Sequence, residues 1–142
     1  APDLVYHGSE GVTMKRRLIH TPNAPGAVGT YNQAVQANGL LFTSGQVGII
    51  PATGEMIEGG TSAEALQALK NIGSILEEAG SSLGDIMKLT VYIVDMGEFS
   101  LVNQAFQTFF GDIDFPARST VEVSALPVGA RVEIDCVAIA GE

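Results

Sequence analysis

The stretch that decides the fold covers residues 61–94, TSAEALQALKNIGSILEEAGSSLGDIMKLTVYIV, and combines a helical pattern with a strand pattern. Its apolar residues recur three or four positions apart, at Ala65, Leu66, Leu69, Ile72, Leu76 and Ala79. Thr61 and Glu64 have the spacing of a capping box, and Gly80 is suited to the position after a helix. The pattern therefore predicts a helix over residues 62–79.

The elements on either side of this helix follow from periodicity and turn signals. β-Branched and aromatic side chains predict a strand over residues 87–94, and Asn38-Gly39 predicts a tight hairpin turn. The other predicted elements are a second helix over residues 98–110 and strands over 17–20, 31–37, 40–44, 119–123 and 131–140. The order β-β-β-α-β-α-β-β predicts one α/β (α+β) domain, with about six strands and two helices packed on one face of the sheet.

The last predicted strand alternates between two kinds of side chain. One set is small or apolar and suits packing against helices: Val132, Ile134, Cys136, Ala138 and Ala140. The other set mixes charges with large aliphatic groups: Arg131, Glu133, Asp135, Val137 and Ile139. Such a half-polar face is typical of a surface that pairs with another subunit around a polar cleft, although a solvated sheet face gives the same pattern.

Composition limits the classes of protein and partner. The chain has 142 residues, of which 46% are hydrophobic and 16% charged, so we expect one domain with a full apolar core. The charged fraction lies below the usual value of about 25%, which predicts that surface is buried against another subunit. Sixteen Asp and Glu against seven Lys and Arg give a net charge of −9. That charge disfavours nucleic acid as a partner, because it repels phosphate.

Residues 1–13 show no periodic pattern and are interpreted as a vector-derived remnant or a loose extension, which leaves residues 14–142 as the domain. One cysteine, Cys136, and two histidines, His7 and His20, are too few for an intrachain disulfide or a zinc site. No apolar run reaches the roughly 20 residues of a membrane span, and no signal-peptide pattern occurs. We therefore expect no membrane association, no cofactor, and a cytoplasmic location, or the mitochondrial matrix in a eukaryote.

The most specific motif consists of three neighbouring segments, FPARSTVEV at 115–123, ALP at 125–127 and GARVEID at 129–135. Earlier motifs precede it in order: Asn23-Ala24-Pro25, Gly29-Thr30-Tyr31 with Gln33-Ala34-Val35, Thr43-Ser44-Gly45-Gln46, Thr53-Gly54-Glu55, Val91-Tyr92 with Asp95, and Val102-Asn103. Over about residues 23–140 the chain resembles the RidA/YjgF family. These proteins are reactive intermediate (imine/enamine) deaminases, also called the liver perchloric-acid-soluble protein family.

The resemblance implies a chorismate-mutase-like domain with a mixed sheet, assembled as a homotrimer with three clefts between subunits. It also implies an activity, the hydrolysis of 2-imino acids to 2-oxo acids and ammonia. Expected substrates are 2-iminopropanoate and 2-iminobutanoate, and their hydrolysis removes reactive intermediates such as 2-aminoacrylate.

The family motif also implies roles for particular residues. Arg118 would bind the substrate carboxylate, and Glu133 would position or activate water. The other expected substrate-binding residues are Tyr31, Gly45, Asn103 and Thr120. Thr30 stands where the family often has proline. Thr120 stands beside Arg118 where the family often has cysteine, so substrate preference can differ here. The strand alternation turns Arg118 and Glu133 away from the helices. With an antiparallel pairing of the last two strands, they lie toward opposite ends of a cleft or meet across a subunit boundary.

Three other interpretations compete with the enzyme. The first is a regulator that binds 2-oxo acids in the Arg118 cleft without turnover, which leaves Glu133 without a role. The second is an endoribonuclease or translation inhibitor, against which the acidic balance and the absence of a histidine pair or acidic metal cluster argue. The third is that Arg118 and Glu133 form a plain interface salt bridge with a structural role.

Overall fold

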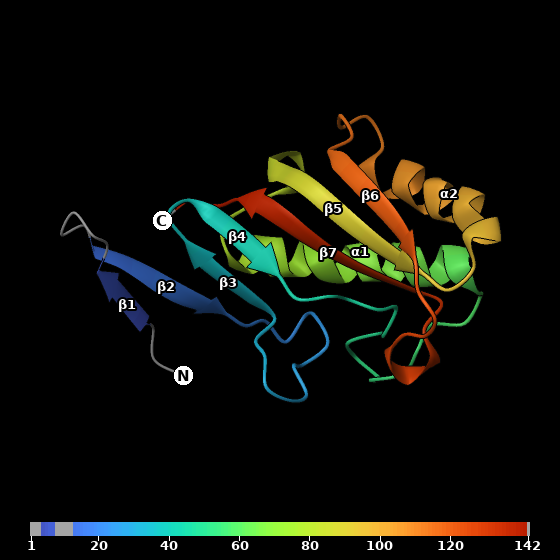
Figure 1. Ribbon diagram of the computed structural model, residues 1–142, viewed down its shortest axis with the longest axis horizontal. Coiled ribbons are helices and arrows are strands. Elements are labelled where there is room, and N and C mark those ends of the chain that lie inside the picture. The colour runs from blue at the N-terminus through green and yellow to red at the C-terminus, as the bar shows by residue number, and fades with distance from the viewer. Residues whose placement is uncertain (1–3, 8–12, 142) are drawn as a thin grey trace.

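The computed structural model describes residues 4–7 and 13–141, which form a mixed sheet with two helices on one face (Figure 1). The strands are β1 (Leu4–His7), β2 (Thr13–Ile19), β3 (Ala34–Ala37), β4 (Leu40–Thr43), β5 (Ile86–Ile93), β6 (Ala117–Glu122) and β7 (Val132–Ile139). The helices are α1 (Thr61–Glu78) and α2 (Phe99–Phe110), with short 3-10 turns η1 (Leu83–Asp85), η2 (Met96–Glu98) and η3 (Pro127–Gly129). The predicted fold class is confirmed. The predicted element order is confirmed from β2 onward, and β1 adds a seventh strand before it.

The strands lie in the order β1-β2-β3-β4-β7-β5-β6. Strand β7 pairs antiparallel with both β4 and β5, whereas β6 runs parallel to β5 after the crossover through α2. The last two strands therefore do not pair with each other, and the antiparallel pairing considered for them is wrong. The crossover through α2 places β6 on the outer side of β5, so β5 lies between β6 and β7.

The predicted hairpin at Asn38-Gly39 is confirmed, although its first strand starts later than expected. Asn38 and Gly39 have φ angles of 53° and 79°, the left-handed values that a two-residue type I′ turn requires. The turn sets the register, in which Ala37 lies opposite Leu40. Strand β3 begins at Ala34 rather than at Tyr31, because the preceding residues form a loop.

Helix α1 begins and ends close to the predicted residues, but its capping box does not form. The Thr61 hydroxyl donates to a carboxylate oxygen of Glu98 at 2.8 Å, and Glu64 accepts the backbone N–H of Arg131 at 2.8 Å. Both side chains thus bind groups far away in sequence. At the other end, Gly80 has a φ of 75°, as the C-terminal stop requires.

The core lies between the sheet and the helices. The predicted helix-facing residues of β7 are all buried: Val132, Ile134, Cys136, Ala138 and Ala140. The apolar stripe of α1 meets them with Ala65, Leu69, Ile72 and Leu76, each of which has no exposed surface. This packing makes β7 a rigid support for the side chains on its opposite face.

The N-terminal segment is described in part. Strand β1 pairs with β2, which continues into the sheet by pairing with β3. Residues 1–3 and 8–12 lie outside the described residues, so the assignment of residues 1–13 to an extension stays a prediction. Among the described residues, neither helix combines the length and apolar character needed to cross a membrane.

Candidate active site

Arg118 is held by three side chains of α2. Its guanidinium carbon lies 5.1 Å from the ring centroid of Phe99 and 4.8 Å from that of Phe106. One guanidinium nitrogen donates to the side-chain oxygen of Asn103 at 2.9 Å. Two aromatic faces and one amide thus fix the plane of a cation that has further N–H donors available for an anion.

The register of β6 shows why Arg118 points toward α2. Arg118 lies opposite Leu89 of β5, and Thr120 lies opposite Val91. Leu89 and Val91 are completely buried on the helix side, and paired residues point to the same face of a sheet. Arg118 and Thr120 therefore lie on the helix side too. The expectation that Arg118 faces away from the helices is wrong.

A cavity opens beside the guanidinium. Its volume is about 310 Å³, and it is lined by Asn103, Phe106, Gln107, Phe115, Pro116 and Arg118. Partial burial lowers the pKa of Arg118 from its ordinary value, yet the group stays charged at neutral pH. The arrangement offers a fixed positive charge at the edge of a mostly apolar hollow, which suits a small carboxylate.

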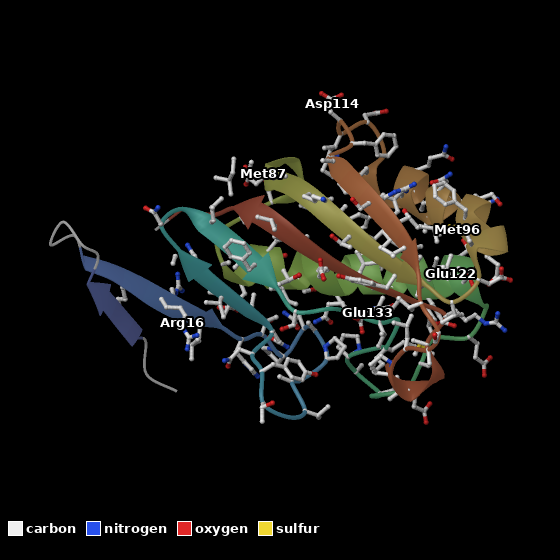
Figure 2. The ribbon with its side chains drawn as sticks, viewed as in Figure 1. Arg16, Met87, Met96, Asp114, Glu122 and Glu133 are labelled. Atoms are coloured by element: carbon white, nitrogen blue, oxygen red, sulfur yellow. The ribbon has the colours of Figure 1, made fainter. Side chains whose placement is uncertain are left out.

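Glu133 lies on the other face of the sheet, opposite the helices, and is labelled in Figure 2. Its carboxyl group lies against Gly45: a Cβ built on that glycine would be 2.5 Å from a carboxylate oxygen of Glu133. The neighbouring backbone fixes this contact, since Gln46 and Ile134 exchange N–H···O bonds of 2.8 and 2.9 Å. The predicted pair of Gly45 and Glu133 is thus brought together within one subunit.

Two further polar side chains accompany Glu133 on that face, Tyr92 and Asp135. Burial raises the pKa of Glu133, and the charge of Asp135 raises it further. Burial also raises the pKa of Asp135, while a hydrogen bond from Tyr92 opposes that rise. Burial and the two carboxylates raise the pKa of Tyr92. Glu133 is therefore a stronger base, when ionised, than an ordinary glutamate.

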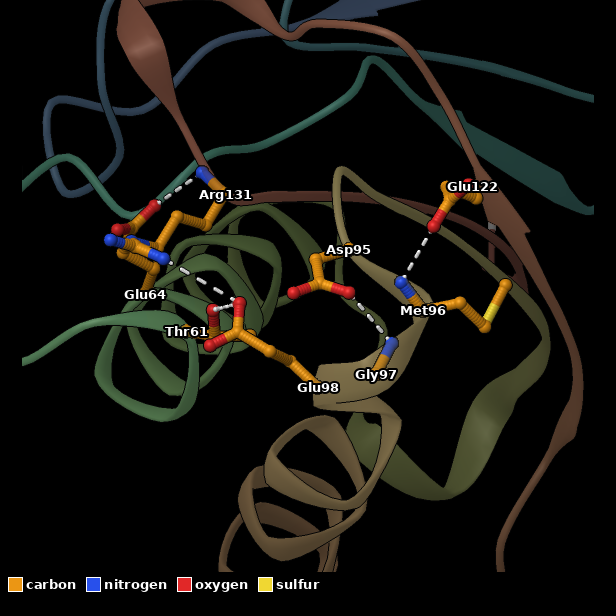
Figure 3. Close-up of polar contacts among 8 residues, drawn as sticks. All are labelled: Thr61, Glu64, Asp95, Met96, Gly97, Glu98, Glu122 and Arg131. Carbon is orange, nitrogen blue, oxygen red and sulfur yellow. Dashed lines mark hydrogen bonds and ion pairs between the residues drawn. The ribbon is translucent and has the colours of Figure 1, made fainter.

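A polar network fixes the chain where β7 begins (Figure 3). The backbone N–H of Arg131 is bound by the nearly buried Glu64, and the Arg131 guanidinium lies 3.5 Å from a carboxylate oxygen of Glu98. Because Glu98 also accepts from Thr61, the starts of both helices are tied to β7. The network holds the backbone two residues before Glu133.

Tyr31 lies in the loop before β3 and belongs to neither the Arg118 side nor the Glu133 side of the sheet. The tyrosine is 47% exposed, and its hydroxyl accepts the backbone N–H of Val28 at 3.4 Å. Buried Gln33 braces this loop by exchanging hydrogen bonds with the backbone of Thr21 and donating to Pro25 at 2.8 Å. Tyr31 is thus presented to solvent on a braced loop.

The predicted site residues therefore fall into separate groups within one subunit. Arg118, Asn103 and Thr120 form an anchor group on the helix side, and Glu133 and Gly45 form a carboxylate group on the open face. An ion pair between Arg118 and Glu133 of the same subunit is excluded by their opposite faces. The sequence-based assignment missed the ring contacts that Phe99 and Phe106 make with Arg118. The cluster that Glu133 forms with Tyr92 and Asp135 was also missed, because its residues come from two strands.

Comparison with known proteins gives consistent matches over most of the chain. A family model described as endoribonuclease L-PSP matches residues 21–140. A human protein named 2-iminobutanoate/2-iminopropanoate deaminase is 45% identical over 126 residues, 89% of this chain and 91% of its own. A RutC family protein of Aquifex aeolicus (strain VF5) is 48% identical over 124 residues, 87% of this chain and 98% of its own.

Solved structures agree with these matches. The Rid-family protein YyfA from Yersinia pestis has a TM-score of 0.85 and 45% identity, covering 88% of this chain and 99% of that one. TdcF from E. coli, solved with bound serine, has a TM-score of 0.83 and 38% identity, covering 88% of this chain and 99% of that one. The fold is thus shared with proteins of one family.

Proposed function

The chain belongs to the endoribonuclease L-PSP family, whose members are also named Rid, YjgF and RutC, and from this premise we propose that it hydrolyses 2-imino acids. It is an enzyme, a 2-iminobutanoate/2-iminopropanoate deaminase that releases 2-oxo acids and ammonia. The observation that carries this conclusion is the 45% identity, over 89% of the chain, to a curated deaminase of that name. The geometry supports it with an anchored cation and a separately held carboxylate.

Arg118 is the anchor for the substrate carboxylate. A guanidinium matches a carboxylate with two parallel N–H donors, and its plane is already fixed by Phe99, Phe106 and Asn103. Because its orientation is set before substrate arrives, little conformational entropy is lost on binding. The anchor leaves the imine carbon free for attack by water.

Glu133 handles the water. A water molecule adds to the carbon of the protonated imine, and the carboxylate takes up one of its protons. The same proton then goes to the nitrogen of the tetrahedral adduct. The C–N bond breaks and ammonia leaves as the C=O bond forms, and the carboxylate takes up the hydroxyl proton and passes it to the departing ammonia, which leaves as ammonium. A carboxylate whose pKa is raised by burial and by Asp135 accepts that proton more readily than an exposed one.

A second copy of the chain completes the site in this proposal. Strand β5 lies between β6 and β7, so Arg118 and Glu133 start from strands about 10 Å apart and point to opposite faces. A substrate the size of 2-iminopropanoate cannot touch both. It touches both when the anchor group of one subunit faces the carboxylate group of the next. Such head-to-tail contacts close into rings.

Three copies form the ring, as the family resemblance implies. The open face of the sheet offers the contact surface, because its apolar side chains remain accessible in the single chain: Phe42 and Ile139 are each 50% exposed, and Val121 is 43% exposed. These residues lie on the same face of the sheet as Glu133 and form surface that a neighbouring subunit can bury. Sedimentation of the purified chain at micromolar concentration tests the assembly, and a stable monomer would contradict it.

Binding without turnover and cleavage of RNA are the competing functions. A pure 2-oxo-acid binder needs Arg118 and leaves the buried, base-strengthened Glu133 unused. An RNA-cleaving enzyme needs to attract phosphate, yet the net charge is −9, and three of the seven cations lie in sequence at Lys15, Arg16 and Arg17 on β2. Both alternatives are outcomes of the assay below.

The experiment generates imines in situ with an amino-acid oxidase and follows ammonia and 2-oxo acid against the spontaneous rate. The wild-type chain should accelerate release, Arg118→Ala should lose both turnover and product binding, and Glu133→Gln should keep binding and lose rate. Binding of pyruvate with no acceleration would favour the regulator. Cleavage of RNA by wild type but not by these variants would favour the nuclease.

A further inference from the structure

The cavity beside Arg118 is larger and more apolar than the smallest imino acids require. Its volume of about 310 Å³ is in the range of sites that bind small molecules, which begins at roughly 300 Å³. An anchored carboxylate and imine carbon fill part of that space, and the methyl group of 2-iminopropanoate adds little more. The remaining space, lined by residues of the same subunit as Arg118, can hold a larger side chain.

The walls of this space are aromatic and rigidly held. Phe115 is 59% exposed, yet its ring packs edge-to-face on Phe110, with centroids 5.9 Å apart. The ring centroid of Phe110 in turn lies 5.9 Å from that of Phe106, and the Arg118 guanidinium stacks on the Phe106 ring. The buried rings of Phe106 and Phe110 thus link the cation to the outer wall. Pro116, with its fixed backbone, joins that wall to Arg118 in sequence.

Gln107 forms the opposite rim from α2. It is exposed, one helical turn after Asn103, and lines the cavity with the same face of the helix. Its amide is uncharged, so the cavity contains one charge, the Arg118 guanidinium. A ligand that fits has a carboxylate at one end and an apolar group at the other.

We propose that this cavity is a side-chain subsite, and that it gives the enzyme a preference for 2-imino acids with a bulky apolar side chain, as derived from leucine, over 2-iminopropanoate. This inference rests on the proposed hydrolysis and adds the substrate class. The carboxylate binds Arg118, and the side chain lies between Phe115, Pro116 and Gln107. Each methylene removed from water favours binding by about fourfold, so three more carbons, partly enclosed, should give about tenfold or more in kcat/KM.

The test compares imines made in situ from leucine and from alanine by one oxidase, with catalase present. Gln107→Phe fills the cavity from an exposed position, so the fold is kept. Gln104→Phe is the matched control, because Gln104 is an exposed glutamine of the same helix outside the cavity lining. Wild type and Gln104→Phe should prefer the leucine imine, and Gln107→Phe should lower the leucine-to-alanine ratio of kcat/KM about tenfold.

Binding of the products separates this inference from the proposed function. Calorimetry should show that 4-methyl-2-oxopentanoate binds about tenfold more tightly than pyruvate, and that Gln107→Phe removes this difference. Failure to hydrolyse either imine, with the binding preference intact, would reject the activity and keep the subsite. Equal binding of both 2-oxo acids, or the same substrate ratio in the two phenylalanine variants, would overturn the subsite.

Discussion

Gly45→Ala tests the placement of the Glu133 carboxyl group with a single added carbon. The new Cβ would lie 2.5 Å from one carboxylate oxygen of Glu133, 2.6 Å from its Cδ and 3.0 Å from its Cγ. Gly45 does not adopt a left-handed φ, so the alanine backbone itself is tolerated. The nearest atoms belong to the end of a flexible side chain, which means that the side chain moves and the fold stays.

The size of this movement follows from the same distances. Ordinary contact begins at 3.4 Å, so the Glu133 oxygen must retreat by about 0.9 Å. A displacement of about 1 Å at a catalytic group can cost about 100-fold in rate. We therefore expect kcat/KM to fall about 100-fold while the binding of 2-oxo acids, which depends on Arg118, changes little. The melting temperature should stay within a few degrees of wild type.

The assay is ammonia release from oxidase-generated 2-iminobutanoate, combined with thermal unfolding of each variant. Gly84→Ala is the matched control, because a Cβ at Gly84 meets nothing within 4 Å and its backbone is not left-handed. The control should keep wild-type activity. If Gly45→Ala is as active as Gly84→Ala, the position of the Glu133 carboxyl group does not matter for hydrolysis and its role as the water-handling group is refuted.

Three further substitutions test other parts of the account. Cys136→Ala should retain activity, because burial raises the pKa of the thiol to about 12 and keeps it un-ionised. It should lower the free energy of unfolding in denaturant by about 1 kcal/mol, because the residue is only 2% exposed. A large activity loss with an intact fold would restore a thiol mechanism. Asp135→Asn should move the acidic limb of the pH–activity profile to lower pH. Removal of the neighbouring charge lowers the raised pKa of Glu133, so the carboxylate stays ionised in more acid solution. An unmoved limb would contradict this. Glu64→Leu should lower the free energy of unfolding by about 1–3 kcal/mol, because it leaves the Arg131 N–H unpaired. Glu64→Gln keeps an acceptor and should lower it less. Equal losses in the two variants would reject this hydrogen bond as the cause.

Local patterns predicted the elements whose geometry depends on neighbouring residues. The Asn38-Gly39 turn is one, because both positions must have positive φ and few residue pairs allow this. The faces of β7 are another, since a strand between two neighbours has one side against the helices and its period of two identifies that side. In both cases the relevant interactions lie within a few residues or follow a strict periodicity.

Contacts between distant segments explain what was missed. Thr61 and Glu64 have the spacing of a capping box, but Glu98 and Arg131 bind them instead. The side of the sheet to which Arg118 points depends on the pairing of its strand with β5. The sequence of a half-polar edge strand does not indicate which of its sides faces the helices. The sequence motif named Arg118, Asn103, Gly45 and Glu133 as one site, whereas the pairing of strands divides them between two faces.

The central claim is that the anchor group of one subunit and the carboxylate group of another form each active site. Co-expression of Arg118→Ala and Glu133→Gln, each inactive alone and distinguished by different tags, gives mixed assemblies that can be purified through both tags. If each cleft takes its two groups from different subunits, every mixed trimer has both native groups in one of its three clefts, and about a third of wild-type activity should return. If both groups act within one subunit, every subunit remains defective, and mixed assemblies as inactive as their parents would contradict the account.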